Sequence, residues 1–210
     1  MGYYKSHDAR HEAVAKPQAG VGAQGQPADK PVPAAASSRH DNLLQKVVPL
    51  IGQKQYDKAL GVLGPAAGQD QELANAMGVC LMRLGRIEEA VRLFRTLVLA
   101  PGCTWPRPNL PNVYKTNFAT ALLLAGHPSG CVEILAEVRD EQDAQVQRLR
   151  AAIRKWESEL SVFQRLNWWI ARVEPSGRPV PLEFEPGELL RPAEVSAVAN
   201  GLPTASAEAV

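Results

Sequence analysis

The middle of the chain repeats a helical pattern in which apolar residues recur at every third or fourth position. Between residues 74 and 94, two such runs meet at a tight turn centred on Gly85. Each run carries one apolar face, as expected for two amphipathic helices that pack against each other. Small residues stand at Gly78 and Ala90, where the two helix backbones must approach closely. The spacing therefore predicts an antiparallel helix pair.

Similar helix pairs precede and follow this central unit. Upstream, two apolar helical faces lie between residues 43 and 63, and Ala59 occupies the position that corresponds to Ala90. Downstream, a third pair follows, in which Cys131 takes the same place. About three helix pairs therefore fill residues 41–138.

The alternation of small and large residues in these helix-turn-helix units resembles the tetratricopeptide repeat, most closely in the central unit. The resemblance implies an all-α fold, a right-handed superhelical array of about three helix pairs. It also implies that the first helix of each pair lines a concave groove that binds other molecules. The candidates for lining this partner-binding groove are Val48, Asn75, Val79, Met82, Arg83, Asn117, Thr120 and Leu123.

The expected groove is mainly apolar, with Asn75, Arg83 and Asn117 at its polar edges. Family members that clamp a C-terminal carboxylate use a lysine and an asparagine where this chain has Leu44 and Val48. Recognition of a carboxylate tail is therefore disfavoured, and the groove suits an apolar extended peptide or a partner helix. A segment of the same chain is an equally good occupant.

A proline-rich insertion separates the second and third units. Residues 101–112 contain four prolines, which exclude both a helix and a central strand. We expect a loop on one face of the array. Trp105 lies in this loop, where it either contacts a partner or folds back over the helix ends.

One long C-terminal helix is expected over residues 140–172, about 50 Å at the usual rise per residue. A heptad seam supports it, formed by Val146, Leu149, Ile153, Trp156, Leu160 and Phe163. The first half would cap the array, and the second half would extend beyond it with Trp168 and Trp169. Adjacent residues of a helix point about 100° apart, so a single flat neighbour cannot bury both tryptophans. This apolar cluster needs a cover, either the following arm or a second molecule.

The remaining segments complete the domain organisation. Residues 1–38 contain almost no large aliphatic side chains and are expected to be disordered. Residues 39–173 form the helical domain. Residues 174–190 are expected to be an extended arm, since apolar side chains alternate between residues 180 and 184. It either fills the groove or covers the long helix. Residues 191–210 are a second disordered tail.

Composition and charge limit the classes of function that we expect of this chain. The formal net charge is +1 with mixed signs along the chain, so no nucleic-acid surface is expected. No apolar run is long enough to span a membrane. Three well-separated cysteines and no signal peptide favour reduced thiols in the cytoplasm. Phosphate-binding and dinucleotide-binding motifs are missing. A nucleophilic pair would have to join His127 to Cys103 or Cys131, so we expect no catalytic residues, metal ligands or cofactor.

These features together predict a non-catalytic scaffold or adaptor that binds another protein or a peptide in an apolar concave groove. A small secretion-type chaperone is an alternative, because some bacterial export chaperones are three-repeat proteins of this size. Another is a regulatory subunit attached to an enzyme. The heptad seam also suits a homo-oligomer formed through the long helix.

Overall fold

The computed structural model of the chain describes residues 34–68, 70–138, 140–175 and 177–189. The disorder predicted for residues 1–33 and 191–210 lies outside this part. The first helix already begins at Ala34, ahead of residue 39, where the sequence placed the start of the helical domain.

Every regular element of the described residues is helical, which confirms the all-α class. The elements are α1 (Ala34–Gly52), α2 (Tyr56–Leu63), the 3-10 helix η1 (Gly64–Gly68), α3 (Gln71–Arg83), α4 (Ile87–Val98), α5 (Asn112–Leu124), α6 (Pro128–Ala136), α7 (Ala144–Glu159) and α8 (Val162–Ala171). The three predicted helix pairs correspond to α1 with α2, α3 with α4, and α5 with α6.

The α3–α4 pair shows how the sequence specifies its local structure. The side chain of Asp70 accepts hydrogen bonds from the backbone N–H groups of Glu72 and Leu73, which caps the start of α3. The turn into α4 uses Gly85 in the left-handed region, at a φ of 75°. Within the pair, Gly78 lies against the ring of Phe94, which is fully buried. A small residue is therefore needed where the two helices meet.

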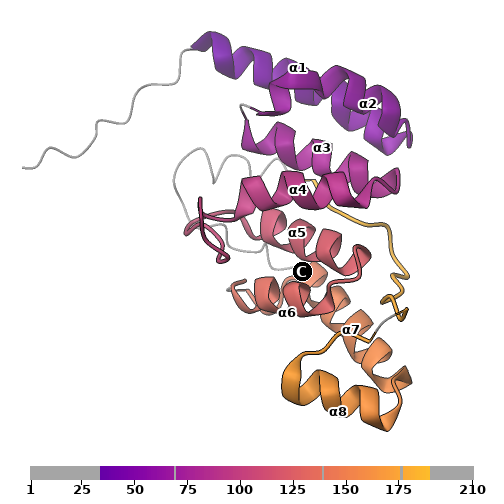
Figure 1. Cartoon of the computed structure of the whole chain (residues 1–210). Helices are drawn as coiled ribbons and strands as arrows, with labels where there is room; N and C mark the ends of the chain where they lie inside the picture. Colours follow the sequence, from indigo (N-terminus) through magenta and orange to yellow (C-terminus); the bar gives the residue numbers. More distant parts are fainter. Residues whose placement is uncertain (1–33, 69, 139, 176, 190–210) are drawn as a thin grey trace, which may run out of the picture. The chain divides into compact units, whose positions relative to one another are not determined.

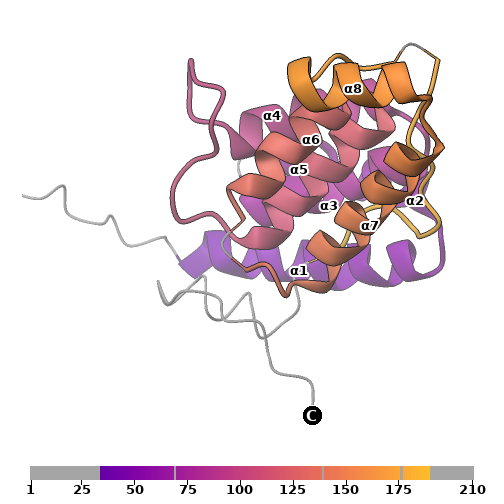
Figure 2. The same cartoon turned by 90° about the horizontal axis from the view of Figure 1, so that it is seen from below.

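Helices that are consecutive in sequence pack against each other from α1 to α6, so that the chain builds a succession of layers (Figure 1). Helices two positions apart also touch, namely α1 with α3, α3 with α5, and α5 with α7. Seen from below, α5 lies in the middle of its neighbours (Figure 2), and its residues from Tyr114 to Leu123 are buried. The alternate helices α1, α3, α5 and α7 thus form one continuous side.

The single long helix expected over residues 140–172 is wrong. The chain breaks after Glu159, because Leu160 is extended, with a ψ of 145°, and Ser161 starts a new helix. Ser161 and Gln164 form a capping box, in which each side chain bonds the other residue's backbone N–H. The heptad seam is buried as far as Leu160, whereas Phe163 beyond the break is 81% exposed. The seam therefore belongs to α7 alone.

The two adjacent tryptophans of α8 have different environments. Trp168 is fully buried and packs edge-to-face on Trp156 of α7, with 5.3 Å between the ring centroids. Its indole N–H donates to Glu157 at 2.6 Å. Trp169 is 69% exposed. The prediction that one neighbour cannot bury both rings is therefore confirmed.

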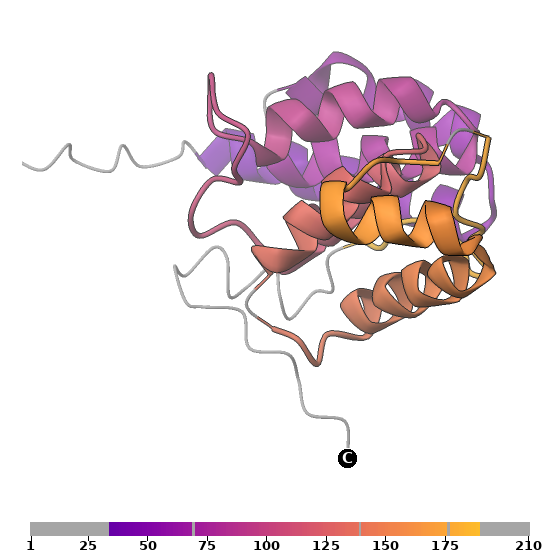
Figure 3. The same cartoon turned by 60° about the horizontal axis from the view of Figure 1, so that its bottom comes forward.

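The arm does not cover the apolar cluster of α8, which excludes one of the two covers considered for it. The exposed side chains on α8 and directly after it, which we call the α8 face, are Val162, Phe163, Leu166, Trp169, Ile170 and Val173. Figure 3 shows α8 beside α7, at the end of the helical succession. The arm runs elsewhere because its first contacts are with α7. The carbonyl of Arg178 accepts a hydrogen bond from the indole N–H of Trp156 at 2.9 Å, and Val180 is buried.

The proline-rich insertion is a loop, as predicted. An isolated antiparallel bridge joins Leu99 to Pro106 across its neck. The guanidinium of Arg107 donates to the carbonyls of Leu99 and Thr96 at 3.1 and 2.9 Å. Trp105 is 64% exposed and therefore does not fold back over the helix ends.

Residues 177–189, which we call the strap, follow α8 without regular secondary structure. The strap runs back along the helical succession, from α7 towards α3 (Figure 1). Hydrogen bonds from α7, α5 and α3 hold it along this path. The strap thus lies on the side of the domain that is formed by the alternate helices, where it contacts α7, α5 and α3.

Candidate functional site

The last five described residues of the strap, Glu185–Leu189 (the tip), lie against two asparagines on neighbouring helices. The side chain of Asn117 on α5 closes a pair of hydrogen bonds on the backbone of Glu188. Its Nδ2 donates to the Glu188 carbonyl at 2.7 Å, and its Oδ1 accepts from the Glu188 N–H at 2.9 Å. From α3, Asn75 Nδ2 donates to the same carbonyl at 3.3 Å. Both backbone groups of one strap residue are therefore satisfied by side chains.

The two asparagines are also bonded to each other. Asn117 Nδ2 donates to Asn75 Oδ1 at 2.7 Å, and both residues are almost completely buried. Burying a carboxamide is unfavourable unless its polar atoms find partners. The backbone of Glu188 supplies these partners where the strap covers the two amides.

Arg83, the last residue of α3, binds the next part of the tip. Its Nε donates to the carbonyl of Pro186 at 3.0 Å, and its NH2 group donates to the carbonyl of Gly187 at 2.8 Å. The side chain of Arg83 is only 13% exposed. Hydrogen bonds from a charged donor are stronger than those from a neutral one. Together with the asparagines, Arg83 holds the backbone over three consecutive residues.

Gly187 fits a position with no space for a side chain. Its φ is 81°, in the left-handed region that disfavours every other residue. A Cβ atom there would lie 2.7 Å from the Cε of Met82 and 2.9 Å from the Cγ2 of Val79. Both helix residues are buried beneath the glycine. They form an apolar floor that only a bare backbone can approach this closely.

Two glutamates flank the glycine and meet polar groups of the helices. Glu185 accepts a hydrogen bond from the hydroxyl of Tyr56 at 2.7 Å and lies 3.4 Å from Arg83 NH1. The bond from Tyr56 lowers the pKa of Glu185 below its ordinary value. Glu188 pairs with Arg148 NH1 on α7 at 3.3 Å. The tip therefore presents one carboxylate on each side of the glycine, each with a cationic partner.

The structure brings five of the eight sequence-predicted groove residues around the tip: Asn75, Val79, Met82, Arg83 and Asn117. The other three lie differently. Leu123 is in the core, and Thr120 is buried with its hydroxyl donating to Thr116 of its own helix. Val48 lies on α1 and is 48% exposed, so it is not enclosed with the others. Of the other predicted contact residues, Trp105 and Trp169 are exposed and Trp168 is not.

Sequence reasoning missed Tyr56 and Arg148 as parts of this site. Tyr56 starts the second helix of its pair, and Arg148 lies beyond the three units. Neither position follows from the repeat pattern. The charges of Glu185 and Glu188 gave no signal by themselves, because a solvated carboxylate needs no cationic partner.

The two buried cysteines have no reactive setting. Burial raises the pKa of Cys131 to about 12 and that of Cys80 to about 11, so both thiols are protonated at neutral pH. His127 is instead paired with Glu174 at 3.4 Å. Burial raises the pKa of Glu174, but the hydrogen bonds from Ser129 and His127 outweigh burial, and the net shift is downwards. His127 and Glu174 therefore serve together to hold the start of α6.

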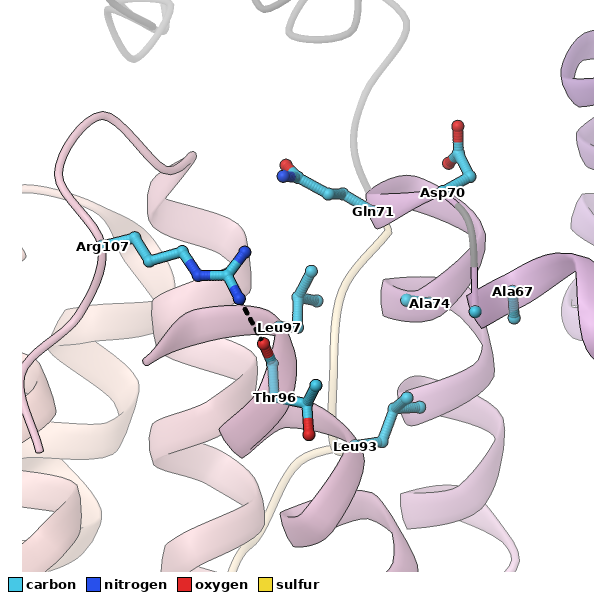
Figure 4. A pocket seen from close by; sticks show the side chains of 9 residues that line it. Ala67, Asp70, Gln71, Ala74, Leu93, Thr96, Leu97 and Arg107 are labelled. Carbon is cyan, nitrogen blue, oxygen red and sulfur yellow. Dashed lines mark hydrogen bonds between the residues drawn. The ribbon is translucent and has the colours of Figure 1, made fainter. Parts of the chain in front are cut away.

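A small hollow lies between α3, α4 and the proline-rich loop, with a volume of about 220 Å³ (Figure 4). Its walls are mostly aliphatic, including Ala74, Leu93 and Leu97. The polar groups at its rim already serve the fold. Asp70 caps α3, and Arg107 bonds two backbone carbonyls. The hollow thus offers no set of convergent polar groups for a substrate.

Two negative findings apply to the part of the chain that the structure describes. No group of three or more His, Cys, Asp or Glu side chains is placed there to hold a metal ion. None of its helices has the length and apolar character needed to cross a membrane.

Comparison with protein-family models, with curated proteins and with solved structures finds no match for this chain.

Proposed function

We propose that this chain is a non-catalytic interaction scaffold, built as a tetratricopeptide-like array, whose groove binds an extended segment of another protein. The contacts of α1 with α3, of α3 with α5 and of α5 with α7 support the array. Such contacts are expected where the first helices of successive pairs line one side of a solenoid. The capping helix of the array is α7.

The observation that carries the proposal is the pair of hydrogen bonds between Asn117 and the backbone of Glu188. Side chains that bind backbone N–H and C=O groups recognise an extended chain whatever its side chains are. Asn75 and Arg83 add three more such bonds. The hydrogen bonds that hold the strap tip support a groove that binds a peptide backbone.

The test releases the strap tip and offers a peptide in its place. In the full-length protein, Gly187→Val introduces both a clash with Val79 and Met82 and an unfavourable φ. Amide hydrogen exchange over residues 185–189 verifies that the tip is released. Panning a random peptide library should then enrich peptides that bind this variant and that bind wild type much more weakly.

The matched control is Gly177→Val. Gly177 also has a positive φ, of 71°, but a Cβ there meets nothing within 4 Å. This control should behave like wild type in the panning. A second substitution, Asn117→Ala, placed in the Gly187→Val background, should abolish peptide binding while thermal unfolding shows that the domain is still folded. Failure of a released groove to enrich any peptide would overturn the proposal.

A second candidate function, self-association, is favoured by the α8 face. With about 150–250 Å² for a large aromatic side chain and somewhat less for an aliphatic one, its six side chains expose on the order of 800 Å². This is about the area that each partner buries in a standard protein interface. Patches of this size are unusual on monomers.

The spacing along the α8 face suits a second copy of the same chain. Phe163 and Val173 are equidistant from residue 168, and so are Leu166 and Ile170. An antiparallel pair of α8 helices would therefore place Leu166 opposite Ile170, as a two-fold axis requires, and would bring Phe163 towards the segment with Val173 that follows the other copy's α8.

A lipid surface fits the α8 face less well. Interfacial helices present free cationic side chains to lipid headgroups. Here Arg165 donates to the carbonyls of Glu157, Ser158 and Leu160, and Arg172 lies 5.0 Å over the Trp168 ring. Both arginines of the segment are thus engaged within the protein.

Sedimentation velocity of the full-length chain tests self-association. A dimer should form with rising concentration. It should disappear in Ile170→Glu, because the interface between the two α8 faces would bury the added charge away from water. Val48→Glu, an exposed apolar position on α1, is the matched control and should leave the dimer intact. A wild type that stays monomeric up to high micromolar concentration would exclude this candidate.

A further inference from the structure

We propose that the groove selects partner segments in which a glycine is flanked by acidic residues, and that the strap tip is an internal copy of that motif which the partner displaces. The inference rests on the proposed function of the groove and adds the chemistry of the partner. In this chain the motif reads Glu185-Pro186-Gly187-Glu188-Leu189.

The glycine requirement follows from two independent constraints. The backbone at Gly187 has a positive φ, and the space where a Cβ would lie is filled by Val79 and Met82. A flexible methionine end could move aside, but Val79 is a stiff β-branched residue in the middle of α3. The unfavourable φ would remain even then. If a partner segment had any other residue at this position, its backbone could not keep the hydrogen bonds to Arg83 and Asn117 on either side of that residue.

The acidic requirement follows from the groups on either side of the glycine. Arg83 and the Tyr56 hydroxyl face Glu185 on one side, and the Arg83 guanidinium lies 5.7 Å from the Tyr56 ring centroid. On the other side Arg148 faces Glu188. Without carboxylates in the tip, Arg83 would keep only its backbone acceptors, and Arg148 would lose Glu188. Opposite charges across an interface raise specificity more than affinity.

The strap divides into a stem that belongs to the fold and a tip that can be exchanged. In the stem, residues 177–184, Val180 is buried in the core and Arg178 accepts the hydrogen bond from Trp156. In the tip, Gly187 alone is buried and the other four residues are exposed or half-buried. The tip is held by hydrogen bonds to its backbone, by the contacts of its two glutamates and by Leu189, which packs half-buried against the core. A competing backbone can replace these bonds one for one.

The same division indicates that the competing segment comes from a different protein. The stem fixes the strap of each copy to its own α7, through Trp156 and an ion pair of Lys155 with Glu183. Within the described strap, only the five tip residues are left to move, too few to carry the motif from its own stem to the groove of a second molecule. A partner with a free motif has no such constraint.

Direct titration of a peptide tests the inference. A fluorescein-labelled peptide with the sequence of the tip, residues 185–189, is added to full-length wild type and to full-length Gly187→Val. The variant should bind the peptide at least about tenfold more tightly, because in wild type the tethered tip competes at a millimolar effective concentration. Gly177→Val should bind like wild type.

Peptide variants separate the two requirements. Replacing the peptide's glycine by alanine should weaken binding to Gly187→Val by at least about tenfold, since the floor admits no Cβ. Replacing both glutamates by glutamine should weaken it several-fold and remove most of its salt dependence. Arg148→Gln in the protein should reproduce part of the second effect.

The outcomes distinguish the inference from the proposed function. If unrelated library peptides bind the released groove and the strap peptide does not, the motif is wrong and the scaffold function stands. The same holds if the alanine peptide binds as tightly as the glycine peptide. If no peptide of either kind binds a groove shown to be open, both proposals fall. Formation of strap-exchanged dimers by Gly187→Val mixed with wild type would overturn the choice of a different protein as partner.

Discussion

At the scale of single residues, Gly78 controls how closely α3 approaches α4. A Cβ at this position would lie 2.3 Å from the Cζ of Phe94, which is too close for two nonbonded carbon atoms. Phe94 is fully buried, so its ring cannot turn away freely. We expect Gly78→Ala to lower the free energy of unfolding by about 1–3 kcal/mol, and Gly78→Leu by more. Urea denaturation followed by circular dichroism measures both.

Gly61→Ala is the matched control for this prediction. Gly61 lies within α2, is exposed, and a Cβ there would meet nothing within 4 Å. The same substitution should therefore raise stability by about 0.5–1 kcal/mol, through the higher helix propensity of alanine. Equal effects at the two positions would show that Gly78 does not mediate a close approach.

Glu185 makes the attachment of the strap tip depend on pH. Because the hydrogen bond from Tyr56 lowers its folded-state pKa below the ordinary 4.5, its carboxylate stabilises the folded state above pH 4.5. This stabilisation is lost as pH falls through the lowered value. Wild type should therefore melt at a higher temperature than Glu185→Gln at pH 7, and the difference should shrink towards pH 3. A difference that stays constant would contradict the assignment.

The contacts around the strap tip show which residues a repeat pattern can place. Asn75, Arg83 and Asn117 were expected in the groove because helical periodicity fixes which side a residue faces once its helix pair is known. Tyr56 and Arg148 were not, because their role depends on where the strap crosses the helices. An irregular segment has no periodicity, so its path is set by contacts distant in sequence and cannot be read locally.

At the scale of elements, the break between α7 and α8 shows where periodicity misleads. The apolar spacing continues unbroken from Leu160 to Phe163, which favours one helix. The competing signal was a serine three residues before a glutamine, a capping box that starts a new helix. Capping and periodicity disagree here, and the burial of Trp168 against Trp156 requires the turn. At α3 the Asp70 cap and the apolar periodicity agree, and the helix that periodicity alone predicts is present.

Ser161→Ala should therefore destabilise the start of α8. Loss of an N-cap hydroxyl costs about 1 kcal/mol, which corresponds to about fivefold faster amide exchange in the first turn of α8 if that turn opens locally. Ser158→Ala is the control. Its hydroxyl only bonds back to Lys155 within α7, so little change is expected. If both variants exchange alike, the capping box does not hold the break.

At the scale of the whole described region, the strap is part of the folded domain and not an appendage. Truncation after Pro175 would remove Val180 from the core, leave the Trp156 indole N–H without its acceptor and expose Val79 and Met82. We expect a lower melting temperature and red-shifted tryptophan emission, measured by calorimetry and fluorescence. An unchanged spectrum would mean that Trp156 does not depend on the strap.

The path of the strap also has a consequence for folding cooperativity. In an array whose layers touch only their neighbours, the end units can unfold separately, and folding propagates from one layer to the next. Here Glu185 bonds Tyr56 across 129 positions of sequence, and Glu188 bonds Asn117 across 71. Such distant contacts close a loop around the layers, which slows folding and couples α2 to α7. Wild type should therefore unfold in one transition, whereas a chain with a released tip should lose its α1–α2 end first.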